Sequence, residues 1–108
     1  MRSELAQLLA EFELILTPSA AALPWSATES HPSQIAGQSV CPRGHAVFTA
    51  FANAAGLPGL ALPAAPSPSG LPIGFQLLGR QGADAALLAL GLHYEDHHPW
   101  RQRWPTLD

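Results

Sequence analysis

The chain has 108 residues, of which 47% are hydrophobic and 12% are charged, and its formal net charge is −3. These values argue against intrinsic disorder, which needs low hydrophobicity and high net charge, and against a basic nucleic-acid-binding surface. All the basic residues are arginines and the only cysteine is Cys41, so a lysine base, a Schiff base and an internal disulfide are excluded within this chain.

The hydropathy pattern also bears on location. There is no run of 18 apolar residues and no charged segment ahead of a short apolar one. Membrane-spanning helices and secretory signals carry those patterns. We therefore expect a cytoplasmic protein without a membrane partner.

An amphipathic helix is predicted over residues 3–12. Ser3 is the expected N-cap, because a serine hydroxyl can accept a hydrogen bond from the first turn. Apolar side chains recur at the i, i+3, i+4 and i+7 spacing that places them on one helical face. The residues of this face are Leu5, Leu8, Leu9 and Phe12.

A short strand over residues 13–17 and a long irregular loop over residues 18–44 are predicted next. Pro18 ends the strand because proline donates no ladder hydrogen bond. The loop is rich in proline, glycine and serine, and connections of this length are either functional or disordered linkers. Apolar anchors at Trp25, Ile35 and Val40 favour a loop laid over the rest of the fold.

A second helix is predicted over residues 45–55, followed by two strands. Gly56 suits the left-handed position that ends a helix, and Pro58 prevents its continuation. Strands over residues 59–63 and 73–78 are joined by a connection too short for a helical crossover, so they should form an antiparallel hairpin. The apolar face of the helix carries Phe48, Phe51, Ala52 and Ala55.

A third helix should begin at Asp84, whose carboxylate suits the positive end of the helix dipole. Its expected buried stripe is Leu87, Leu90, Gly91 and Tyr94. The predicted order is helix, strand, loop, helix, strand, strand, helix, which is an α/β class. Strand 73–78 is apolar on both faces and should be internal. Three strands cannot cover three apolar helices, so residues 1–108 resemble one partial domain of a larger α/β sheet.

Residues 37–41 and His45 contain candidate nucleophiles. Gly37 to Cys41 is similar to half of a nucleophile elbow centred on Ser39, but an elbow needs a preceding strand, a following helix and glycine in place of Cys41. Cys41 and His45 also form a possible thiol–imidazole pair. We interpret the partial elbow as a chance match. We interpret Cys41 as a small, semi-buried cysteine without a catalytic role.

Two features near the C-terminus have functional and plainer interpretations. His93, His97 and His98 could bind a metal together with Glu95 and Asp96. His93 and His97 are one helical turn apart, as two ligands would be, but a third ligand would have to come from elsewhere. We expect a solvated helix end with no bound metal or cofactor. The aromatic and basic tail over residues 100–104 suits stacking on nucleic acid, a membrane interface or packing against the fold. The negative net charge favours packing and no nucleic-acid partner.

Two longer runs resemble the C-terminal block of the amidase signature family. Residues 48–63, FTAFANAAGLPGLALP, are similar to its F-T-x-x-x-N-x-x-G-x-P pattern with a following strand that ends in proline. Residues 70–80, GLPIGFQLLGR, are similar to its G-L-P-x-G-x-Q-L-x-G pattern. The LILTP run at residues 14–18 resembles the upstream strand. The resemblance covers nearly the whole chain and implies the C-terminal portion of the amidase-type mixed sheet.

The resemblance also implies what this portion does. Family members are hydrolases of amide bonds or amidotransferase subunits, and their nucleophilic serine, second serine and lysine base lie in an earlier Gly/Ser-rich core. No catalytic residue is therefore expected in this chain. Ala46, Phe48 and Thr49 match the helix that lies near the substrate cleft. The family's amidotransferase A subunits carry an acidic residue at the position of Ala46, and its absence argues against recognition of amino-acid amides.

The sequence thus leads to one main functional hypothesis with two alternatives. The chain is expected to be a C-terminal fragment of an amidase signature hydrolase, supplying sheet, helices and cleft wall, and inactive alone. The alternatives are a non-catalytic binding or regulatory subunit that completes a separately encoded core, and an unrelated enzyme using Cys41 or the histidines. The expected partners are the remainder of an amidase core, or further copies through self-association, and an amide-bearing small molecule.

Overall fold

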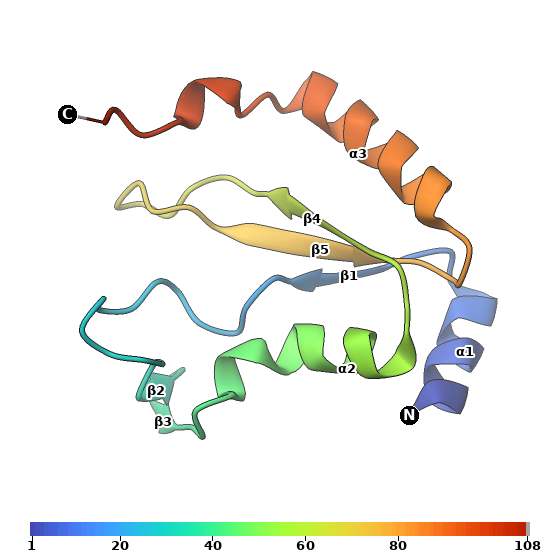
Figure 1. The fold of residues 1–108 in the computed structure, drawn as a ribbon, viewed down its shortest axis with the longest axis horizontal. Coiled ribbons are helices and arrows are strands. Elements are labelled where there is room, and N and C mark those ends of the chain that lie inside the picture. The colour runs from blue at the N-terminus through green and yellow to red at the C-terminus, as the bar shows by residue number, and fades with distance from the viewer. Residues whose placement is uncertain (108) are drawn as a thin grey trace.

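The computed structural model describes residues 1–107 and shows a three-stranded sheet with helices on both sides (Figure 1). The three α-helices and the three strands of the main sheet follow the order expected from the sequence, whereas β2, β3, η1 and η2 were not expected. In chain order the elements are α1 (Arg2–Glu11), β1 (Ile15–Pro18), β2 (Gln34–Ile35), β3 (Gln38–Ser39), η1 (Gly44–Ala46), α2 (Val47–Ala55), β4 (Gly59–Pro63), β5 (Gly74–Leu78), α3 (Asp84–His97) and η2 (Arg101–Arg103). Helix α3 lies over one face, and α2 lies on the opposite side with α1 near its C-terminal end.

Strand β5 is the centre of the sheet, in the order β1-β5-β4, and pairs antiparallel with both neighbours. Leu77 lies between Leu16 of β1 and Leu60 of β4, and it packs in the core beneath α3. Leu78 points to the opposite face and is fully buried. The expected hairpin and the internal position of this strand are thus confirmed. Within residues 1–107, the outer edges of β1 and β4 have no partner strand.

An apolar core fills the space between α3 and the sheet. Leu62, Leu77 and Leu87 form its buried centre. Gly91 allows the close approach of the helix, because a Cβ there would lie 2.6 Å from Leu60 Cδ2. Leu90, expected in the buried stripe, is exposed instead. The helix is apolar over several faces, so the pattern did not identify which residues meet the sheet.

The other side of the sheet is more loosely covered. Helix α1 buries only Leu9 of its predicted apolar face, while Leu8 and Phe12 are 40% and 51% exposed. Ser3 is not the N-cap: the helix begins at Arg2, so the N-cap is Met1 and the hydroxyl of Ser3 falls inside the first turn. Gly56 ends α2 in the left-handed conformation, as expected, with a φ of 68°.

The segment over residues 18–44 is more regular than expected. Its β2 and β3 strands form a two-stranded antiparallel pair. The turn between them has positive φ at both Ala36 and Gly37, which is the hairpin geometry that matches strand twist. Alanine rarely adopts that conformation, so the sequence carried no hairpin signal. In the described part of the chain, no helix is both long and apolar enough to cross a membrane.

Candidate functional site

The three predicted cleft-lining residues lie together where α2 begins. Ala46 ends η1, and Phe48 and Thr49 belong to the first turn of α2; all three are half-buried. The Thr49 hydroxyl donates a 3.1 Å hydrogen bond to the Ala46 carbonyl. This bond orients the threonine side chain back toward η1. Because alanine has only a methyl group, position 46 offers no charge to a ligand.

A buried glutamine fixes this helix start to the sheet. Gln76 of β5 is 7% exposed, and its Nε2 donates to the Phe48 carbonyl at 2.5 Å and to the Thr17 hydroxyl at 2.8 Å. These bonds join β5 to β1 and to α2. Buried polar groups are costly to leave unpaired, so these two bonds fix the position of the first turn of α2 relative to the sheet. Gln76 was not among the predicted site residues, although a glutamine in an apolar strand was a usable signal.

A cavity of about 370 Å³ opens beside this region. Its walls come from residues 18–25 after β1 and residues 72–74 before β5. The loop wall is tied to η1 by a 3.0 Å hydrogen bond from the Ala21 amide to the His45 carbonyl. Among the described residues, no titratable side chain lines this cavity, so it suits binding of an uncharged group better than proton transfer. The three predicted site residues do not line it.

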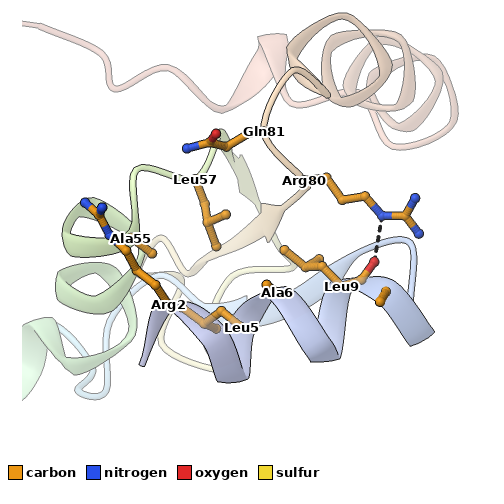
Figure 2. Close-up of a pocket in the computed structure, with 9 residues that line it drawn as sticks. Arg2, Leu5, Ala6, Leu9, Ala55, Leu57, Arg80 and Gln81 are labelled. Atoms are coloured by element: carbon orange, nitrogen blue, oxygen red, sulfur yellow. Dashed lines mark hydrogen bonds between the residues drawn. The ribbon is translucent and has the colours of Figure 1, made fainter.

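A larger cavity, of about 600 Å³, lies between α1, the end of α2 and the segment after β5 (Figure 2). Leu5, Leu9 and Leu57 give it apolar walls. Arg2 and Arg80 stand at its ends: Arg2 donates to the Ala54 carbonyl at 3.1 and 3.3 Å, and Arg80 Nε donates to the Leu9 carbonyl at 2.6 Å. The cavity was not predicted from the sequence, because it depends on contacts between distant parts of the chain.

The candidate nucleophiles are not assembled into a catalytic group. Ser39 lies in β3 and is exposed, so the strand–turn–helix context of an elbow is missing. Cys41 is exposed, not semi-buried as expected. The Nδ1 atom of His45 is buried without a hydrogen-bond partner. Ser30 Oγ and His31 Nδ1 are 2.9 Å apart in an exposed loop, but no carboxylate in residues 1–107 bonds to His31. Such a pair lacks the third group that orients a catalytic histidine.

The histidines and the C-terminal tail have mainly structural contacts. The His93 and His97 rings lie 4.4 Å apart, centroid to centroid, and His97 Nδ1 contacts the His93 carbonyl at 2.8 Å. No group of three metal-ligating side chains occurs in the part of the chain that the structure describes. Trp100 packs against the core and Arg103 Nη1 donates to the Ala64 carbonyl, as expected for a packed tail, whereas Trp104 is exposed.

Comparison with known proteins finds a matching family and several similar proteins. A family model described as Amidase matches residues 1–88. The A subunit of the glutamyl-tRNA(Gln) amidotransferase of Thermodesulfovibrio yellowstonii is 39% identical over 61 residues, which are 56% of this chain and 13% of that protein. Its counterpart from Ectopseudomonas mendocina is 31% identical over 96 residues, 89% of this chain and 19% of that protein.

Solved structures show the same fold over most of the chain. A bacterial aryl acylamidase of the amidase signature family superposes with a TM-score of 0.81 and 31% identity, covering 91% of this chain and 21% of that one. The A subunit of the glutamyl-tRNA(Gln) amidotransferase of Thermotoga maritima gives a TM-score of 0.68 and 28% identity, covering 92% and 20%. The chain thus spans about a fifth of these two proteins.

Proposed function

This chain belongs to the amidase family, and on that premise we propose that it is the C-terminal portion of an enzyme that hydrolyses amide C–N bonds. It supplies part of the sheet and one wall of the substrate cleft. The observation that carries the proposal is the Gln76 network, which places the first turn of α2 against β1 and β5. Gln76 belongs to the run of residues 70–80 that resembles the family pattern.

The portion is inactive by itself. Amide hydrolysis needs an activated nucleophile, a proton acceptor and donors that stabilise the oxyanion. The sequence contains no lysine, and neither Ser39 nor Cys41 makes a hydrogen bond to a histidine in the described residues. The remainder of an amidase core must therefore provide the reacting groups, whether in the same polypeptide or in a separate one.

Ala46, Phe48 and Thr49 form the wall of the cleft and favour an uncharged amide-bearing small molecule. Support comes from the side chains themselves: a methyl group, an aromatic ring and a hydroxyl that is already bonded to a backbone carbonyl. A charged substrate would need a charged partner in the wall, because an unpaired charge is costly to desolvate. Position 46 has none.

The rest of the core would cover surface that is open in this chain. The outer edges of β1 and β4 are unpaired in the described residues, and Leu16 on β1 is 66% exposed. Unpaired edges and exposed apolar side chains favour pairing with a further strand. We also propose a cytoplasmic location, which is supported by a single cysteine that can form no disulfide within the chain.

The test is hydrolysis of a neutral aryl amide and of an amino-acid amide by the purified chain, alone and mixed with the N-terminal core of a related amidase. Product released only by the mixture, and mainly from the neutral amide, supports the proposal. In that mixture Phe48→Ala should raise KM, while Leu88→Ala on the exposed surface of α3 should not. Hydrolysis by the chain alone that is lost in Ser39→Ala or Cys41→Ala would contradict it, as would no hydrolysis by either preparation.

A further inference from the structure

The cavity of about 370 Å³ beside the start of α2 is built by two segments of this chain that are bonded to each other. The Ser19 amide donates to the Gly74 carbonyl at 3.1 Å, which continues the pairing of β1 with β5. The Ala21 amide donates to the His45 carbonyl at 3.0 Å and joins the loop wall to η1. Backbone bonds therefore hold the walls in place, and the cavity is preformed, as small-molecule sites usually are.

Trp25 forms part of the wall, and its ring is held in one orientation. The indole Nε1 donates to the Glu29 carbonyl at 3.1 Å, across a turn closed by a 3.0 Å bond from the Glu29 amide to the Ser26 carbonyl. The His45 ring packs against the indole, with ring centroids 4.9 Å apart and planes inclined at 58°. Because the indole N–H is already bonded, Trp25 offers a ligand its apolar and π surface, which suits another aromatic ring.

Ser19 supplies a hydroxyl to the same cavity. Its side chain is half-buried, and its Oγ bonds to no other residue in the described part of the chain. A Cβ at Gly74 would lie 2.9 Å from this oxygen, so the glycine leaves room for the hydroxyl beside β5. A hydroxyl both donates and accepts, so it can bond to either end of a neutral amide group.

These features together define the ligand. The walls are mainly apolar, one aromatic ring is fixed in orientation, and no titratable side chain occurs among the described residues that line the cavity. A charged ligand would lose its hydration without gaining a counter-charge. We propose that the cavity binds the aromatic group of an uncharged amide, with the ring against Trp25 and the amide bonded to Ser19. That this amide is the substrate rests on the proposed function, whereas its binding does not.

The test is binding of benzamide to the purified chain, followed by proton–nitrogen correlation NMR. The backbone amide signals of Ser19 and Gly74 and the indole signal of Trp25 should shift together and give one dissociation constant. Ser19→Ala should weaken binding about three- to tenfold, because one hydrogen bond to the ligand is lost. Ser33→Ala is the matched control, since this serine is exposed and belongs to the same long segment.

Two analogues of benzamide separate the contribution of the ring from that of the amide. Benzoate keeps the ring but is charged, and cyclohexanecarboxamide keeps the amide but has no π system. Each should bind at least about threefold more weakly than benzamide. Trp25→Leu should remove the preference for benzamide over cyclohexanecarboxamide, whereas Trp104→Leu, at an exposed position outside the cavity, should keep it. The preference is a ratio measured within one variant, so a general loss of affinity does not alter it.

Three results would overturn the proposal: none of the three signals shifts, Ser19→Ala binds benzamide as the native chain does, or benzoate binds as tightly as benzamide. The titration is repeated in the mixture with the N-terminal core of a related amidase. Loss of binding there would mean that the core fills the cavity, and it would also overturn the proposal. Benzamide binding without hydrolysis by the mixture would contradict the proposed function alone, and hydrolysis without binding in this cavity would contradict only this inference.

Discussion

The two faces of the sheet are stabilised in different ways. On the α3 face, Leu62, Leu77 and Leu87 make a packed apolar core. On the opposite face, hydrogen bonds from Gln76, Arg2 and Arg80 tether α1 and α2 around cavities. Apolar packing tolerates little rearrangement, whereas tethered helices leave space for a ligand or a partner. One face is therefore packed for stability, whereas the other keeps open space between its tethered helices.

The largest expected effect is on the packed face. Leu87→Ala should lower the free energy of unfolding by about 2–5 kcal/mol, because it removes buried methyl groups and leaves a cavity under α3. Urea unfolding followed by circular dichroism measures the change. Leu92→Ala on the same helix is the matched control, since that side chain is exposed. Equal losses in the two variants would mean that α3 does not pack as described.

A smaller loss is expected at the centre of the tethered face. Gln76→Leu keeps a similar volume but removes the amide that donates to the Phe48 carbonyl and to the Thr17 hydroxyl, which keeps only its own bond to the Pro18 carbonyl. The free energy of unfolding should fall by about 1–3 kcal/mol. Exposed Gln38→Leu serves as the control in the same urea experiment. A Gln76→Leu variant as stable as the native chain would show that the two hydrogen bonds contribute nothing net.

The tether of α1 should have a weaker and more local effect. Arg80→Met removes the bond to the Leu9 carbonyl and should cost about 0.5–1.5 kcal/mol. Amide hydrogen exchange should accelerate in α1 and remain slow in β5, because local opening does not need the sheet to unfold. Arg43→Met, at an exposed position outside α1, is the control. Uniform acceleration throughout the protein would argue against a local tether.

The smallest effect is expected in the hairpin of β2 and β3, which is separate from the three-stranded sheet. Ala36 has a φ of 52°, a left-handed conformation that is unfavourable for a residue with a Cβ. Ala36→Gly should therefore raise the free energy of unfolding by up to about 1 kcal/mol, less the entropy that glycine adds to the unfolded chain. Thermal unfolding provides the measurement, with exposed Ala20→Gly as the control. A lower melting temperature in Ala36→Gly than in the control would contradict the turn geometry.

Local patterns predicted the elements because each depends on neighbours in the sequence. The apolar run in residues 73–78, the prolines that end two strands and Gly56 after a helix are all signals of this kind. The burial of α1 was predicted wrongly for a different reason. The sequence identified the apolar face of this helix, but an amphipathic pattern cannot show whether anything covers that face. Leu8 and Phe12 are therefore apolar, as expected, and exposed.

The candidate site was less predictable for the same reason. The resemblance placed Phe48 and Thr49 near a cleft, but the side chains that tether this side are supplied from elsewhere in the chain. Gln76 reaches Phe48 from β5, and Arg80 reaches Leu9 on α1. Such pairs are fixed by tertiary packing and have no periodic signal. The only hint in the sequence was polarity at an internal strand position.

The place of β5 in the chain has a consequence for synthesis. The central strand is made after both of its neighbours, so within residues 1–107 β1 has no partner until residues 74–78 have left the ribosome. The hairpin of β4 and β5 joins segments close in sequence and should form first, because short loops close at low entropic cost. Strand β1 then docks last, and until that moment the edge that will pair with β5 is also open to other chains. Crowded nascent chains would therefore aggregate through β1 before the sheet is complete.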